Sequence, residues 1–195
     1  MTFASDIAGF LINTVTSLYL IVVVLRGILQ ASRADFYNPI SQVIVQLTRP
    51  PLTMLQRLIP TGKRFDPSVI LLAVFVQAAA ISLLLLTAGY SPPNPLTLGV
   101  WSLIGVASLV VSTYLFTILA MIVVSWVAPD SRSPAVYLLY QITEPVMSPV
   151  RSIIPNIGPL DLSPIAIFVV IQLLQKSLFH MAISVGLPPG LIVGM

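Results

Sequence analysis

Four long apolar runs dominate this chain, and they restrict its possible folds more than any other feature. They cover about residues 7–29, 69–88, 99–127 and 165–185. A helix needs roughly 20 apolar residues to cross the hydrocarbon core of a bilayer. Only 8% of the residues are charged, against roughly 25% in soluble domains, and the mean hydropathy is +1.01. The sequence therefore predicts an all-α membrane protein with four transmembrane helices.

The chain also contains an internal repeat. Residues 46–70 align with residues 141–165 without a gap, at an offset of 95 residues that also holds outside this segment. A repeat of this kind indicates a tandem duplication, so we expect two units, residues 1–97 and 98–195. Each unit contains two crossings, an even number, so the two hairpins should have the same orientation, unlike the inverted repeats of many transporters. Matching pairs include Tyr19/Tyr114, Gln77/Gln172, Pro60/Pro155, Asp66/Asp161 and Ser68/Ser163.

The distribution of lysine and arginine predicts the orientation in the membrane. Seven of the nine basic residues lie in two polar intervals, residues 30–65 and 128–162. Basic residues are enriched in cytoplasmic loops. We therefore expect both intervals to be cytoplasmic and both termini to lie on the other side. Arg26, near the end of the first run, is expected to extend its side chain toward the lipid headgroups.

Each polar interval has the pattern of short amphipathic helices. Asn38-Pro39 and Ser133-Pro134 are typical helix starts, and apolar residues follow them at spacings of three and four. Pro50 and Pro145 are expected to end these helices and to begin a second short helix in each unit. Such helices fit the headgroup region. A shallow re-entrant position is the alternative, and we favour the interfacial one.

The repeated segment carries a family resemblance. In the second unit, Arg151, Pro155, Gly158, Asp161 and Ser163-Pro164, followed by Gln172, resemble the signature R-x-x-x-P…G-x-x-D-x-S-P…Q of the YggT (YlmG-type) membrane proteins. The first unit departs from it, with Asp66-Pro67-Ser68 in place of the Asp-x-Ser-Pro order. The resemblance implies a protein of the bacterial inner membrane, with periplasmic termini. It also implies roles in osmotic stress and ion homeostasis, or in membrane organisation and assembly.

Two carboxylates stand directly before membrane helices. Asp66 and Asp161, with Ser68, Ser163 and Pro164 beside them, form the repeated motif, together with Pro60 and Pro155. One interpretation is a symmetric pair that coordinates a cation or a proton. The other, which we favour, is stabilisation of the helix start by roughly 0.5–2 kcal/mol per cap.

The fourth run contains a stripe of polar residues. Gln172, Lys176 and His180 follow one another at four-residue spacing, with Gln175 beside them. Polar groups in a membrane segment usually face protein or water, so a functional lining is one interpretation. Interhelical hydrogen bonds, or a lysine side chain that reaches the interface, are the other. We expect Gln77 to bond Gln172 across a helix interface.

Five basic residues are candidates for contact with anionic lipid headgroups: Arg49, Arg57, Lys63, Arg64 and Arg151. The alternative is that their charge only sets the topology, and the two interpretations are compatible. The chain has no cysteine and a single histidine, so a thiolate or multi-histidine metal site is not expected. No phosphate-binding glycine loop or nucleic-acid-binding pattern is present. We expect no catalysis, no cofactor and no nucleic acid.

Two functional hypotheses remain from the sequence. In the first, the protein is a scaffold or assembly factor that contacts membrane lipids, a second copy or a partner membrane complex. In the second, it belongs to an ion or small-solute permeation system, with a path between protomers, because four helices leave little room for a path within one chain.

Overall fold

The computed structural model describes residues 3–57, 66–153, 163–188 and 191. These residues form six α-helices and no strand. Four of the helices are long and apolar enough to cross a membrane, as the sequence predicts, and two shorter helices connect them. The helices are α1 (Phe3–Ala31), α2 (Pro39–Leu55), α3 (Pro67–Thr87), α4 (Pro95–Val127), α5 (Pro134–Ile153) and α6 (Ser163–Ser184).

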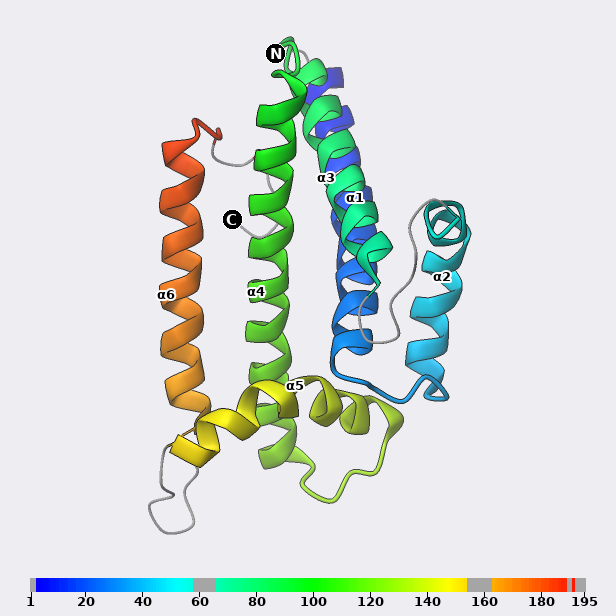
Figure 1. Ribbon diagram of the computed structural model, residues 1–195, viewed down its shortest axis with the longest axis vertical. Helices are drawn as coiled ribbons and strands as arrows, with labels where there is room; N and C mark the ends of the chain where they lie inside the picture. The colour runs from blue at the N-terminus through cyan, green and yellow to red at the C-terminus, as the bar shows by residue number, and fades with distance from the viewer. Residues whose placement is uncertain (1–2, 58–65, 154–162, 189–190, 192–195) are drawn as a thin grey trace.

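The four long helices stand side by side, and the two units run in the same direction. Figure 1 shows α1 and α4 descending to one end of the bundle and α3 and α6 returning from it. We call the end at which α1 and α4 finish the basic end. Within the bundle α3 lies between α1 and α4, whereas α6 packs mainly against α4 and α5 and stands at the edge. The parallel orientation of the two hairpins is therefore confirmed.

Apolar side chains fill the interior of the bundle. The largest cluster joins α1, α3 and α4 with α2 and α5, and it includes Leu20, Val23 and Leu29, which are fully buried. A second cluster around Trp101 ties α4 to the end of α6, where the Trp101 Nε1 donates to the Val185 carbonyl (3.1 Å). The fold thus has the packed core that four membrane helices need.

Local signals in the sequence explain where the helices begin and end. Asn38, Asp66 and Asn94 cap α2, α3 and α4, and each is followed by proline at the first helical position. Proline suits this position because its missing amide would have no partner there. Gly89 closes α3 with φ +82°, a conformation that favours glycine, and the next amide, that of Tyr90, donates to the Leu85 carbonyl.

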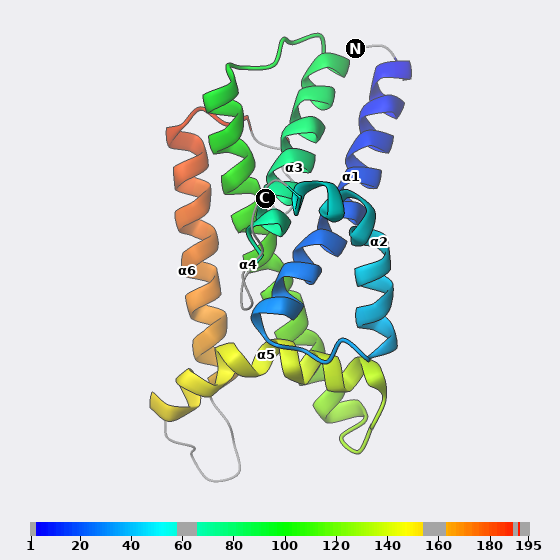
Figure 2. The same ribbon diagram turned by 45° about the vertical axis from the view of Figure 1, so that its right-hand side comes forward.

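The connecting helices differ from the prediction. Pro50 and Pro145 do not separate two short helices, because α2 and α5 are each one continuous helix with prolines inside it. Figure 2 shows that α2 changes direction in its second half, which is the expected effect of an internal proline on a helix. Thr48 and Thr143, just before these prolines, are buried and donate to carbonyls one turn back (2.7 and 2.8 Å).

The two connecting helices also lie differently. Figure 1 shows α5 lying across the ends of the long helices, as expected of an interfacial helix, whereas the first half of α2 runs alongside α1. A re-entrant helix would have the orientation seen in the first half of α2. Two hydrogen bonds join the turn before α2 to α5: Asn38 Nδ2 donates to the Pro134 carbonyl (2.7 Å), and the Asp35 amide donates to Gln141 Oε1 (2.9 Å).

Candidate functional site

Asp66 is buried at the start of α3 and uses both of its carboxylate oxygens. Its Oδ1 accepts from the Ser68 amide (3.0 Å), which is the helix cap that the sequence predicts, and its Oδ2 accepts from Gln56 Nε2 (2.6 Å). Only 6% of Asp66 is exposed. Gln56 directly follows α2, so this carboxylate joins the end of α2 to the start of α3. The contact is polar, and it lies at the boundary of a membrane helix.

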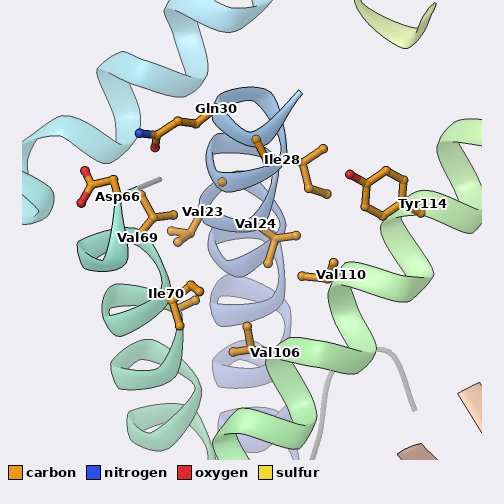
Figure 3. Close-up of a pocket in the computed structure, with 13 residues that line it drawn as sticks. Val23, Val24, Ile28, Gln30, Asp66, Val69, Ile70, Val106, Val110 and Tyr114 are labelled. Carbon is orange, nitrogen blue, oxygen red and sulfur yellow. The ribbon is translucent and has the colours of Figure 1, made fainter. Parts of the chain in front are cut away.

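A cavity of about 230 Å³ lies beside Asp66, between α1, α3 and α4. Figure 3 shows Asp66 and Gln30 at one end of it, and the Tyr114 hydroxyl group directed toward α1. The remaining lining is apolar and includes Val23, Val69 and other aliphatic side chains. A hydrated ion would lose its water here with few oxygen atoms to replace it. The cavity therefore suits an apolar group better than an ion.

The Arg26 side chain is partly buried against the turn that follows α1. Its Nε and Nη1 are buried and have no hydrogen-bond partner in the described part of the chain. Its guanidinium carbon lies 5.1 Å from the centre of the Phe36 ring, a cation–π contact. The negative charge of Asp66 also acts on it through space. Buried guanidinium donors without partners are costly, so this side chain has an unmet need for acceptors.

A second pocket, of about 330 Å³, lies next to this arginine. It is formed by the end of α1, the turn that follows and one face of α2. Two arginines and two glutamines supply all its polar side chains, and the lining contains no carboxylate. The lining residues are Arg26, Phe36, Gln42, Val45, Gln46 and Arg49.

The polar stripe of α6 does not face the interior as a unit. Gln175 turns toward α4 and donates to the Ser112 hydroxyl group (3.2 Å). Gln172 is half-buried, and Lys176 and His180 are exposed on the side of α6 that faces away from the bundle. Among the residues that the structure describes, no carboxylate pairs with Lys176. The stripe therefore cannot line a path inside one chain.

The predicted bond between Gln77 and Gln172 is wrong. Gln77 is almost completely buried, and among the residues that the structure describes neither its Nε2 nor its Oε1 has a hydrogen-bond partner. Its helix, α3, packs against α1 and α4, whereas α6 lies on the other side of α4. The two glutamines occupy equivalent positions in the two units. Each therefore lies in its own unit, Gln77 on α3 and Gln172 on α6, and they do not meet.

The other predicted residues have simpler surroundings. Ser68 and Ser163 are fully buried at equivalent helix starts, and Pro164 is half-buried. Arg57 is exposed, and Arg151 forms an ion pair with Glu144 (3.0 Å). Within the described ranges, no cluster of three histidine or acidic side chains forms a metal site. Some predicted residues lie outside the described ranges; these are Pro60, Lys63, Arg64, Pro155 and Asp161.

The sequence did not single out Gln56, Phe36 or Gln42, and it did not predict that the Arg26 guanidinium group packs against Phe36. One signal was available, namely the positions at which the two units differ. At the offset of 95, Arg26 corresponds to Met121 and Gln56 corresponds to Arg151. Residues present in only one unit cannot be required by the shared fold. Such departures therefore mark where the first unit has acquired features of its own.

Comparisons with known proteins agree with this architecture. The family model described as CCB3/YggT matches the chain twice, at residues 5–87 and 100–182. An uncharacterised protein of Pseudomonas aeruginosa is 40% identical over 188 residues, covering 95% of this chain and 95% of that protein. An uncharacterised protein of Vibrio alginolyticus is 41% identical, covering 84% and 89% of the two chains.

The uncharacterised protein YggT of Escherichia coli K12 is 30% identical over 184 residues, covering 93% of this chain and 95% of its own length. No solved structure matches the chain significantly. Both units and nearly the full length thus align with one group of membrane proteins. This chain belongs to the CCB3/YggT family.

Proposed function

We propose that this protein is a non-enzymatic scaffold or assembly factor of the bacterial inner membrane, with periplasmic termini and a basic, cytoplasmic end. The observation that carries this proposal is the outer face of α6. An exposed stripe runs along this face at spacings of three or four residues, and we call it the outer stripe. It consists of Ile165, Val169, Leu173, Lys176, His180 and Ile183.

The spacing of the outer stripe is the one through which a helix packs against another helix. Four of its six side chains are apolar. Lys176 lies eight residues before the end of α6 at Ser184, which is about 12 Å along the helix axis. A charged side chain near the bilayer centre costs about 2.5–3.5 kcal/mol when it faces lipid. A partner helix with a carboxylate or carbonyl group opposite Lys176 would offset this cost.

A photo-cross-linking residue tests the scaffold role in intact membranes. Placed at Leu173, it should give one discrete adduct with a membrane protein, because this position lies at the middle of the outer stripe. The matched control is Leu11 on α1, which is exposed to a similar degree but has no charged neighbour on its face. The adducts are resolved by gel electrophoresis and identified by mass spectrometry. No protein adduct from Leu173, or equal adducts from both positions, would contradict the proposal.

A path between protomers is the second candidate function, and one observation favours it. Lys176 and His180 both lie on the outer stripe, so copies that meet through α6 would place these polar groups together. The family resemblance to proteins of ion homeostasis supports the same idea. A ring of lysine side chains favours anions in a pore.

Replacing Lys176 with leucine should abolish chloride flux into liposomes that contain the protein, if this path exists. The side chain is exposed, so the substitution should leave folding and insertion intact. Lys176→Arg, which retains the positive charge, is the matched control and should conduct. Flux is followed with a chloride-sensitive dye, and potassium flux provides the comparison. Liposomes in which Lys176→Leu conducts as well as the parent, or the parent does not conduct, would refute this candidate.

A further inference from the structure

Two arginines from different helices meet at one pocket near the basic end of the bundle. Arg26 comes from α1 and Arg49 from α2, and both line the pocket of about 330 Å³ described above. Among the described residues, no acidic side chain lines it. Like charges that share a pocket repel each other. An anion bound between the two arginines would remove this repulsion.

Arg26 has the donors that such an anion would accept. Its Nε and Nη1 carry three N–H groups, and both atoms are buried and unpaired in the described structure. The Phe36 ring covers the guanidinium group, which restricts its movement. Asp66 does not meet the need, because no hydrogen bond or ion pair joins it to Arg26 in the described part of the chain; its oxygens accept from Ser68 and Gln56. Orphaned donors on a fixed guanidinium group indicate a missing acceptor.

α2 is built with three distinct faces, and one of them completes the pocket. With about 100° between successive residues, the three faces are separated by roughly equal angles. One face is buried against the bundle (Ser41, Ile44, Thr48 and Leu52), one is apolar but exposed (Ile40, Val43, Leu47 and Met54), and one is polar (Gln42, Gln46, Arg49 and Thr53). The third face carries three of the pocket residues. A helix that served only to cover α1 would not need it.

We propose that this pocket binds a phosphate ester. A guanidinium group matches the oxygens of a phosphate with two parallel hydrogen bonds, and Arg26 offers a fixed group of this kind. Arg49 is exposed and closes over the anion from the α2 side. The glutamine amides add neutral donors, although Gln42 Nε2 already donates to the Tyr37 carbonyl (3.3 Å).

The second unit provides an internal comparison. At the offset of 95, Arg26 corresponds to Met121, Phe36 to Ser131 and Arg49 to Glu144. Glu144 forms an ion pair with Arg151, and the Thr143 hydroxyl group contacts the Met121 sulfur (3.1 Å). The shared fold therefore forms without the basic pocket. The basic residues of the first unit serve a purpose that the fold itself does not require.

The position of the pocket admits two sources of the phosphate. Arg26 lies five residues before the end of α1, about 8 Å along its axis, which is the depth of lipid headgroups if the helix ends at the interface. The exposed apolar face of α2 would then lie against acyl chains. A soluble phosphate ester could enter from the basic end instead. α2, which carries four of the pocket residues, and α6, which carries the outer stripe, lie on opposite sides of the bundle (Figure 1), so the two proposals can fail independently.

Native mass spectrometry of the full chain, freed of lipid in a non-ionic detergent, tests the proposal. The probes are phosphatidylglycerol, a diacylglycerol with the same acyl chains but no phosphate, and inorganic phosphate. We expect saturable binding of one phosphatidylglycerol and none of the diacylglycerol. Arg49→Gln should weaken the binding at least about tenfold, because it removes charge-assisted hydrogen bonds. Arg57→Gln, an exposed change outside the pocket, should leave it unchanged.

The outcomes separate the sources of the phosphate. Phosphatidylglycerol binding that inorganic phosphate does not displace identifies a lipid headgroup, whereas displacement or direct binding of phosphate identifies a soluble ester. Arg26→Gln should abolish either kind of binding; if this variant does not fold, Arg49→Gln decides, since that side chain is exposed. The proposal would be overturned if neither phosphatidylglycerol nor inorganic phosphate bound saturably. It would also be overturned if Arg49→Gln and Arg57→Gln weakened the binding equally.

Discussion

Replacing Asp66 with alanine should destabilise the folded protein by about 2–4 kcal/mol, one of the two largest effects that we expect from a single substitution. The change removes the cap of α3, which is worth about 0.5–2 kcal/mol. It also removes the acceptor for Gln56, a hydrogen bond to a charged group worth about 1.5–3 kcal/mol. Both bonds are short and Asp66 is 6% exposed, so water cannot replace them. Reversible unfolding in mixed detergent micelles, followed by circular dichroism, measures the loss.

A series of variants separates the two contributions. Asp66→Asn retains an oxygen for the Ser68 amide but loses the charge, so it should be less harmful than alanine. Gln56→Ala removes only the bond to α2, and the double variant with Asp66→Ala should be no worse than Asp66→Ala alone. Glu144→Ala is the control, because its ion pair with Arg151 is exposed and should contribute less than about 1 kcal/mol. If Asp66→Ala were as stable as this control, Asp66 would not be the link that holds α2 to α3.

The long helices could be predicted because a lipid environment leaves few alternatives. Every backbone polar group must be satisfied within the helix, so an apolar run of sufficient length has one favourable structure. The predicted runs and the observed helices differ by at most four residues at any end; the largest differences are at the starts of α1, predicted at residue 7 and observed at Phe3, and of α4, predicted at residue 99 and observed at Pro95. The common direction of the hairpins followed from the repeat. These two features need no knowledge of how the side chains pack.

The structure of α2 and α5 could not be predicted from local signals. Proline removes one helical hydrogen bond and normally ends a helix, so Pro50 and Pro145 suggested breaks. In the structure, Thr48 and Leu52 on either side of Pro50 are both buried against the bundle. Met147, which corresponds to Leu52, is likewise buried beyond Pro145. Packing on both sides of the proline therefore holds the helix together, and tertiary contacts override the local preference.

The candidate site divides in the same way. Asp66 was predicted as a cap because the Asp-Pro-Ser order is a local signal. Arg26 and Arg49 line the same pocket because α2 folds back alongside α1. The turn between the two helices and the packing of α2 determine this arrangement. Lys176 is exposed because no other helix packs against its face of α6, which depends on how the helices are arranged. A sequence shows the spacing of residues on a helix, but it does not show which face has no partner.

Replacing Gln77 with leucine should stabilise the protein by about 1–3 kcal/mol, an effect of the opposite sign and comparable size. The Gln77 amide is buried, and both its Nε2 and its Oε1 lack partners within the described ranges of the chain. An unpaired buried polar group costs about 1–3 kcal/mol, and leucine has a similar volume without polar atoms. The repeat partner, Gln172, is half-buried and belongs to α6, the helix at the edge of the bundle. Gln172→Leu should therefore change the stability much less.

The same unfolding measurement checks this prediction, and its failure would be informative. A destabilising Gln77→Leu substitution would mean that the amide has an acceptor or donor that a single chain does not supply, such as a bound water or a second protein. Gln77→Met distinguishes this result from a poor fit of leucine, because methionine is unbranched and adapts to irregular space. If both variants lower the stability, the amide is paired in the folded protein. If both raise it, the duplication has kept a glutamine in α3 at a cost in stability, which would point to a role outside folding.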